Sequence, residues 1–481
     1  MVAPDTAELT IERARAAGGA PARPAPRARE PNAATAAPRS AWRTVWRAMW
    51  TSHVLAWSAG IVAVLTFGFG PDRGVLDPQG LTRGLGRVGD VLAAAVARWD
   101  SSWFLTIAHF GYRPDLAPYT SPRAAYFPGY PLGIRVISWT GIPLVVAGVL
   151  LSAAAFALAL YGIHRLAELE LPRLHVRSDA VRVPALAVYV TAFSPMAFFF
   201  GAVYSEALFM ALSVGLFWSA RHGRWLQAGL LGALAGATRS TGLMLAVPAL
   251  LLYLYGPRED RVPDRPAPGR PSGRLTGLRS RAGRARELLT PRYRLRRDVL
   301  WLALLPAGVG LYVAWMAAAG GDPLAPFHAE QAWSRHLVGP FTGVWDGLVA
   351  GFDGARQLLS FQRSHVYFTV AGGDPFIAAT HNLLALAFLL AAIPAFVGVF
   401  RRLPLAYGAY ALAAILLPLS YPVAPQPLMS IPRYLIVLFP LSIWLAAWLA
   451  ERPRARRPLL VLSVLAMVFF AGQFATWHWV A

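Results

Sequence analysis

The chain alternates long apolar runs with short polar or arginine-rich segments. Several runs approach the ~20 apolar residues that a helix needs to cross a bilayer. Some are shorter and need tilt, local thinning of the bilayer or burial inside a bundle. The pattern predicts an all-α integral membrane protein with about eleven spans, at Ser52–Phe69, Ile142–His164, Val183–Val203, Ser205–Ala220, Trp225–Thr238, Thr241–Tyr255, Val299–Ala319, Leu383–Phe400, Pro404–Ser420, Tyr434–Leu449 and Leu459–Thr476.

The polar segments predict how these spans are connected. Residues 1–45 are rich in Ala, Pro and Arg and indicate a disordered cytoplasmic tail before a transmembrane domain at 46–481. Segment 256–298 indicates a disordered basic cytoplasmic loop. Segments of about 70–130 and 320–381 are expected to be extracytoplasmic loops with short surface helices. Because arginine clusters favour the cytoplasm, the alternation places the N-terminus inside and the C-terminus outside.

Composition supports a membrane protein. Of 481 residues, 56% are hydrophobic and 14% charged, and the mean hydropathy is +0.46; soluble domains carry roughly 25% charged residues. The net charge of +21 does not indicate nucleic acid, because the arginines lie between apolar runs. Every basic residue is Arg, as in a GC-rich genome, and we interpret the chain as bacterial. Without cysteine there is no thiolate nucleophile or Cys-based metal site.

Asp100 is the first candidate for chemistry. Residues 99–112 can form a helix at the membrane surface, and Phe104 and Ile107 then share the face of Asp100. A carboxylate buried on such a face fits a general base that works near neutral pH. The alternative, an acidic residue that only complements the helix dipole, has equal weight.

Aromatic residues surround this aspartate in sequence. Trp99 and Trp103 lie beside it, and Tyr126 and Tyr130 follow within Tyr126–Pro131, ahead of Arg135. An aromatic belt at the membrane interface is the simpler interpretation. The functional one is a platform for a sugar ring or a groove for a prenyl chain, with Arg135 near a phosphate.

Three later positions place charge beside apolar helices. Tyr204 and Glu206 lie between apolar runs, where Ser205 and Glu206 could simply begin a helix. Arg239 could neutralise the end of one helix while Ser240 caps the next. Ionisable groups at membrane depth tend to be functional, and Arg239 and Arg433 could bind a lipid-linked phosphate through bidentate bonds.

Other polar groups carry less information. The second outer loop contains His328, Glu330, Trp333, Arg335, His336, Asp346 and His365. Their spacing indicates no metal site, and solvated loop is the better interpretation for most of them. No phosphate-binding or dinucleotide-binding glycine motif is present. The predicted cytoplasmic segments are too disordered to form a soluble domain for a nucleotide sugar, which favours a donor that approaches from the lipid.

These blocks also resemble a known family. Arg98-Trp99-Asp100 with Ile107–Tyr112, followed by Ala125–Pro131, is similar to the signature of the PIG-V type mannosyltransferases. The pattern continues through Tyr204-Ser205-Glu206, Thr238–Gly242 and Arg433-Tyr434. The resemblance, from about Trp99 to Leu449, implies the GT-C glycosyltransferase superfamily. Such enzymes use polyprenyl-phosphate sugars outside the cytoplasm, mostly without a metal, and keep an essential acidic residue where this chain has Asp100.

The sequence and the resemblance together predict an inverting mannosyltransferase in the bacterial plasma membrane, with its active site outside the cytoplasm. Polyprenyl-phosphate-mannose would be the donor and a glycolipid or cell-envelope glycan the acceptor. The eukaryotic members extend a glycosylphosphatidylinositol anchor, which we do not expect as acceptor in a bacterium. The alternatives are transfer of another sugar, protein O-mannosylation, or transport of a lipid-linked sugar. Transporters place polar groups near the midplane in repeated halves, and we find no repeat.

Overall fold

A computed structural model describes residues 33–71, 77, 79–112, 121–176, 180–265, 290–361 and 374–480. Most of these residues are helical and none belongs to a strand; Arg335 and Val423 make one isolated antiparallel bridge. The chain divides into two units, residues 1–42 and 43–481. Everything below concerns the second unit, apart from the bounds of its first helix.

Four helices are long and apolar enough to cross a bilayer. They lie within α2 (Ala33–Phe67), α6 (Leu144–Leu174), α15 (Pro375–Arg402) and α19 (Pro453–Ala475). A fifth span is possible where η5 (Arg297–Leu304) and α12 (Ala307–Gly320) meet at a bend of 45°. These helices support a multi-pass membrane protein. The expected number of about eleven spans is not confirmed.

The difference in number lies in shorter apolar helices. They are α7 (Val183–Ala192), α8 (Glu206–Arg221), α9 (Trp225–Thr238), α10 (Ala246–Tyr255), α16 (Leu405–Leu419) and α18 (Phe439–Ala450). A ten-residue helix is only about 15 Å long, half of a ~30 Å hydrocarbon core. Some expected spans are divided between two elements. Val183–Val203 becomes α7 and η3 (Ala197–Gly201), and Tyr434–Leu449 becomes the end of α17 (Ile431–Ile436) and α18.

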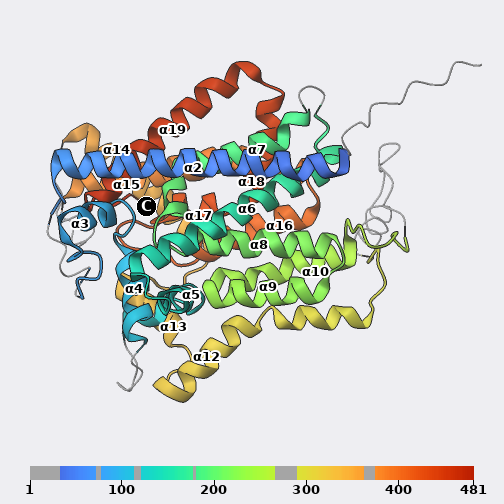
Figure 1. Cartoon of the computed structure of the whole chain (residues 1–481), viewed down its shortest axis with the longest axis horizontal. Coiled ribbons are helices and arrows are strands. Elements are labelled where there is room, and N and C mark those ends of the chain that lie inside the picture. The colour runs from blue at the N-terminus through green and yellow to red at the C-terminus, as the bar shows by residue number, and fades with distance from the viewer. Residues whose placement is uncertain are drawn as a thin grey trace, which may run out of the picture. The chain divides into compact units, whose positions relative to one another are not determined.

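Helices α8, α9 and α10 lie side by side (Figure 1), and α6 packs along α8. The core is formed largely by α6, α7, α8, α16 and α18. At the end of α8, the fully buried Arg221 forms an ion pair with the fully buried Glu170 of α6 and contacts Glu259 at 2.7 Å. Its buried charge is thus balanced by carboxylates inside the protein.

The two expected outer loops contain several helices. The first includes α3 (Gly86–Ala94), α4 (Asp100–Phe110), η1 (Pro122–Ala125) and the start of α5 (Gly129–Ser138). The second includes α13 (Ala325–His328), η6 (Ala329–Trp333), α14 (Pro340–Ser360) and the start of α15. Helix α2 already begins at Ala33, within the segment expected to be a tail. Residues 1–32 of that tail and 266–289 of the basic loop lie outside the described residues.

Candidate active site

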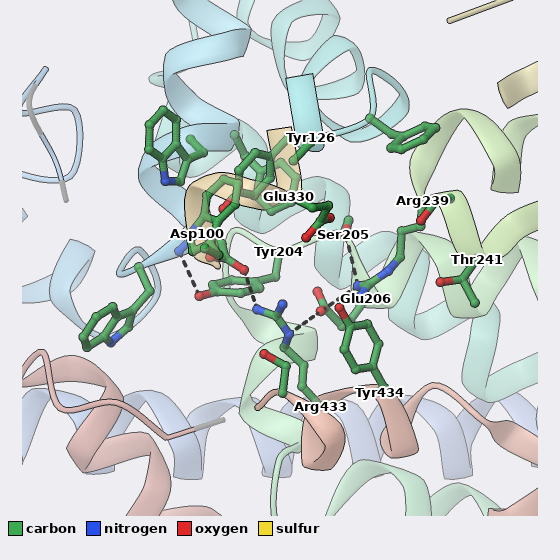
Figure 2. A pocket seen from close by; sticks show the side chains of 18 of the residues that line it. Asp100, Tyr126, Tyr204, Ser205, Glu206, Arg239, Thr241, Glu330, Arg433 and Tyr434 are labelled. Atoms are coloured by element: carbon green, nitrogen blue, oxygen red, sulfur yellow. Dashed lines mark hydrogen bonds and ion pairs between the residues drawn. The ribbon is translucent and has the colours of Figure 1, made fainter. Parts of the chain in front are cut away.

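One pocket collects side chains from both outer loops and from three helix junctions. It has a volume of about 160 Å³. Figure 2 shows the labelled residues converging on it from the starts of α4 and α8, the α9–η4 junction, η6 and α17. It is lined by Trp99, Asp100, Trp103, Phe104, Ala125, Tyr126, Phe127, Tyr204, Ser205, Glu206, Thr238, Arg239, Ser240, Thr241, Glu330, Trp333, Arg335, Met429, Ser430, Arg433, Tyr434 and Trp479.

The backbone around Asp100 is held in place by aromatic residues. Asp100 is the first residue of α4, as expected, so its charge also complements the helix dipole. Its N–H donates to the Tyr204 hydroxyl, which donates in turn to the Arg98 carbonyl, both at 3.2 Å. Trp99 has φ 55° and packs edge-on against Trp477 and Trp479. A non-glycine residue with positive φ stores strain, and such strain is common beside functional groups.

The Asp100 carboxylate has a different partner on each oxygen. Arg433 donates to Oδ2 at 2.5 Å, and the Tyr126 hydroxyl donates to Oδ1 at 3.1 Å. Burial, and then the neighbouring Asp100 charge, raises the pKa of Tyr126 well above its ordinary value. The phenol therefore stays protonated and donates to Asp100. The aspartate side chain keeps 20% of its surface exposed, so a ligand can reach it.

Glu206 joins the two arginines that the sequence singled out. Its side chain is only 1% exposed, and its Oε1 lies 2.7 Å from Arg239 Nη1 and 3.2 Å from Arg433 Nε. Burial lowers the pKa of Arg433, but Asp100 and Glu206 raise it by more, so this guanidinium stays charged. The result is a continuous ionic chain of Asp100, Arg433, Glu206 and Arg239 (Figure 2).

The α9–η4 junction shows why a glycine follows Arg239. Helix α9 ends at Thr238, and η4 (Ser240–Leu245) then folds back against it. A Cβ on Gly242 would lie 2.3 Å from the Gly236 nitrogen and 2.4 Å from the Ala235 carbonyl carbon. Only glycine permits this approach of two backbones. The fold-back directs Arg239 to Ser205 Oγ at 3.4 Å and to Glu206.

Glu206 begins α8 and Arg239 is the C-cap residue of α9, as the simpler interpretation expects, but neither of the serines beside them makes a capping hydrogen bond. Ser205 occupies the N-cap position of α8, but its side chain makes no capping bond and accepts from Arg239. Ser240 is the first residue of η4 rather than its cap. The position of these residues at helix ends is confirmed, and capping by the serine side chains is not.

Eight of the ten predicted site residues line this pocket: Trp99, Asp100, Trp103, Tyr126, Tyr204, Glu206, Arg239 and Arg433. Tyr130 does not line it, because its ring is fully buried and its hydroxyl bonds to Gly148 O at 3.1 Å and Ser152 Oγ at 2.7 Å. Arg135 is exposed on α5 and is also absent from the lining. The structure thus gives no support to a substrate contact by either of these two.

Three lining residues come from the loop that the sequence favoured as solvated. Glu330, Trp333 and Arg335 lie on or just after η6, which packs against η1. Glu330 keeps 34% of its side-chain surface exposed, yet burial at the pocket raises its pKa, with Arg335 opposing the rise. The only signal in the sequence was a cluster of polar and aromatic residues in the second outer loop. Because this loop is more than 200 residues from Asp100 along the chain, the sequence did not predict that both line one pocket.

The pocket combines a reachable carboxylate, two arginines and a wall of aromatic rings. Arginines suit an anionic group such as a phosphate, and a carboxylate that a ligand can reach can accept a proton from a hydroxyl. Within the described ranges, no three His, Asp or Glu side chains converge in a way that could hold a metal ion.

Comparison with known proteins agrees with the motifs. Residues 87–252 match the family described as Mannosyltransferase (PIG-V). The chain is 32% identical to the GPI alpha-1,6-mannosyltransferase 2 of Rattus norvegicus and 31% identical to that of Homo sapiens, each over 186 residues, which is 37% of this chain and 34% of the relative. It thus spans about a third of the length of the curated relatives it matches.

Among solved structures, the Archaeoglobus fulgidus oligosaccharyltransferase is similar with a TM-score of 0.36 and 13% identity, over 89% of this chain and 55% of that chain. The segment matched by the family contains Asp100, Tyr126, Glu206 and Arg239, while Arg433 comes from a later helix. Over residues 87–252 the chain is therefore similar to the PIG-V mannosyltransferases, as its motifs predict.

Proposed function

We propose that this protein is a membrane glycosyltransferase of the GT-C type that transfers mannose from polyprenyl-phosphate-mannose to an acceptor hydroxyl. The ionic chain of Asp100, Arg433, Glu206 and Arg239 around one cavity carries the proposal. It combines a base for the acceptor with cations for the donor phosphate. The similarity to enzymes named mannosyltransferases supports the class of reaction and the sugar.

The proposed reaction is a single displacement with inversion at the sugar C1. The acceptor oxygen forms a bond to C1 while the bond from C1 to the phosphate oxygen breaks. The acceptor proton passes to Asp100, and the bonding electron pair leaves with the phosphate. Arg433 and Arg239 stabilise the charge that grows on the phosphate in the transition state, and Glu206 positions both guanidinium groups.

The pairing of Asp100 with Arg433 gives the donor a second role. Arg433 donates a hydrogen bond to Asp100 Oδ2 at 2.5 Å. A donor phosphate competes for this guanidinium and leaves Oδ2 available to the acceptor. The base is therefore released in the same step that binds the leaving group. We place this pocket on the extracytoplasmic side of a bacterial plasma membrane, with the N-terminus in the cytoplasm.

The test is the substitution Asp100→Asn in protein reconstituted into vesicles with radiolabelled polyprenyl-phosphate-mannose and a series of hexyl glycosides. We expect transfer to fall roughly a hundredfold to ten-thousandfold, the usual contribution of a general base. Helix content and yield in the membrane should stay unchanged. The control is Asp353→Asn, since Asp353 is exposed on α14.

Substantial transfer by the Asp100→Asn protein refutes Asp100 as the base. Movement of the labelled lipid across the vesicle membrane without any glycosyl product would instead favour the transporter alternative.

A further inference from the structure

Three aromatic rings form one wall of the pocket, and they come from both outer loops. Trp103 and Tyr126 are stacked with ring centroids 5.9 Å apart and an interplanar angle of 17°. Trp333 of η6 stands nearly perpendicular to both, at 6.2 Å from Trp103 and 5.8 Å from Tyr126. Each of the three residues is only partly buried. Together they form a corner of apolar faces beside the cavity.

Glu330 supplies a carboxylate near this corner. It lines the same pocket, three residues before Trp333 in η6. In Figure 2 it lies with Tyr126 on one side of Asp100, whereas Arg433 lies on the other. The segment is held in place because the Arg335 N–H donates to the Glu330 carbonyl at 3.3 Å and Arg335 bridges to Val423.

The two carboxylate oxygens of Asp100 face two halves of the pocket that differ in their chemistry. Oδ2 contacts Arg433, which is paired through Glu206 with Arg239, so this half is cationic. Oδ1 contacts Tyr126, so this half is aromatic. A donor phosphate belongs to the cationic half. The acceptor hydroxyl must contact Asp100 as well, and the space left for the rest of the acceptor is the aromatic half.

We propose that Trp103, Tyr126, Trp333 and Glu330 form the acceptor subsite and that it binds an uncharged pyranose ring. The proposal rests on the proposed function, because it assumes that Asp100 is the base. The C–H face of a pyranose packs on aromatic rings, and its hydroxyls donate hydrogen bonds to carboxylates. One hydroxyl contacts Asp100 and reacts, and another donates to Glu330 and orients the ring.

The acidic residues beside the aromatic half of the pocket also favour neutral sugars over acidic ones as acceptors. Glu330 and Asp100 are both acidic, and the nearest cation to Glu330 is Arg335, whose Nε lies 3.6 Å from Oε2. A sugar acid would bring a third carboxylate to this space, and like charges in a poorly solvated site repel each other. The acceptor is therefore a glycolipid or glycan that ends in a neutral hexose rather than a uronic acid.

The test compares acceptor kinetics of full-length wild type with Glu330→Gln, Trp333→Ala and Trp333→Phe, all in vesicles with polyprenyl-phosphate-mannose. The acceptors are hexyl α-mannoside, hexyl β-glucoside and hexyl β-glucuronide. Two controls on α14 change exposed positions: Asp353→Asn removes a similar charge, and Trp345→Phe makes a similar reduction in ring size. Thermal unfolding of each variant separates loss of binding from loss of fold.

We expect Glu330→Gln to raise the acceptor KM severalfold, because the amide oxygen still accepts the hydrogen bond but lacks the charge that strengthens it. Trp333→Ala should raise it roughly two- to tenfold, with Trp333→Phe in between. The donor KM should stay within about twofold. Wild type should prefer the glucoside over the glucuronide, and Glu330→Gln should reduce that preference because it removes one negative charge.

Three results would overturn the subsite. They are an unchanged acceptor KM in both Glu330→Gln and Trp333→Ala, an equal use of glucoside and glucuronide by wild type, and use of the donor with no neutral glycoside accepted. Failure of wild type to use the donor at all is a separate result that contradicts the proposed function itself.

Discussion

Replacing Arg433 by lysine tests the ionic chain without removing its charge. The guanidinium of Arg433 contacts two carboxylates with different nitrogens, Asp100 through Nη1 at 2.5 Å and Glu206 through Nε at 3.2 Å. Its side chain is 10% exposed, so water cannot easily replace a lost contact. A lysine ammonium is a compact charge without this planar fork and can hold one of the two carboxylates at a time.

The expected loss follows from one charge-assisted hydrogen bond that the guanidinium fork can make to the donor phosphate and an ammonium cannot. Such bonds contribute about 1.5–3 kcal/mol, which corresponds to roughly a ten- to hundredfold fall in kcat/KM for the donor. Arg433→Met removes the charge as well and leaves buried Glu206 with Arg239 alone. Breaking a buried ion pair in this way costs about 3–5 kcal/mol of stability. We therefore expect Lys to impair transfer mainly, and Met to impair both transfer and folding.

The assay is the initial rate of mannosyl transfer at varied polyprenyl-phosphate-mannose, together with thermal unfolding in detergent micelles. Arg356→Lys is the matched control, because Arg356 is exposed on α14. If Arg433→Lys keeps kcat/KM for the donor within twofold of wild type, the guanidinium fork has no role in donor binding. If Arg433→Met unfolds at the wild-type temperature, the ionic chain does not stabilise the fold.

Two further predictions concern structure. Gly242→Ala should destabilise the protein by about 1–3 kcal/mol and raise the donor KM, because its Cβ overlaps the backbone of α9; Gly310→Ala, with no atom within 4 Å, should not. The raised pKa of Glu330 means that the folded protein holds this proton more tightly than the unfolded chain, so stability falls as pH rises from the ordinary glutamate pKa through the raised one. The unfolding temperature of Glu330→Gln relative to wild type should therefore increase over that interval, and a constant difference would contradict the assignment.

The local pattern of apolar and polar residues was enough to predict the helices that carry much of the site. The helix from Asp100 and the bounds of α9 agree with the apolar periodicity, because both depend on neighbours in sequence. The charge and motifs of the sequence singled out Asp100, Glu206, Arg239 and Arg433. These residues do converge on one pocket, although their distances in sequence reach 333 residues.

Contacts that depend on the path of the chain between helices could not be predicted. Glu330 and Trp333 reach the pocket because η6 packs against η1, and no periodicity in the second outer loop indicates this. Tyr130 belongs to the same motif as Tyr126, yet it lies inside α5 and turns toward Ser152 of α6. Four residues of separation place two side chains on one face only within a continuous helix, and α5 begins at Gly129.

The two ends of α8 show why charge at membrane depth does not by itself identify a site. Glu206 begins this helix and Arg221 ends it, about 24 Å away by the rise of a 16-residue helix. Both belong to buried ionic clusters, and the general expectation of function applies to both. Arg221 is fully buried and paired with Glu170 and Glu259, which accounts for it as part of the core. Glu206 instead holds Arg433 against Asp100, whose side chain is one-fifth exposed to a cavity. Charge that stays accessible, rather than burial or ion pairing, is what distinguishes the candidate active site.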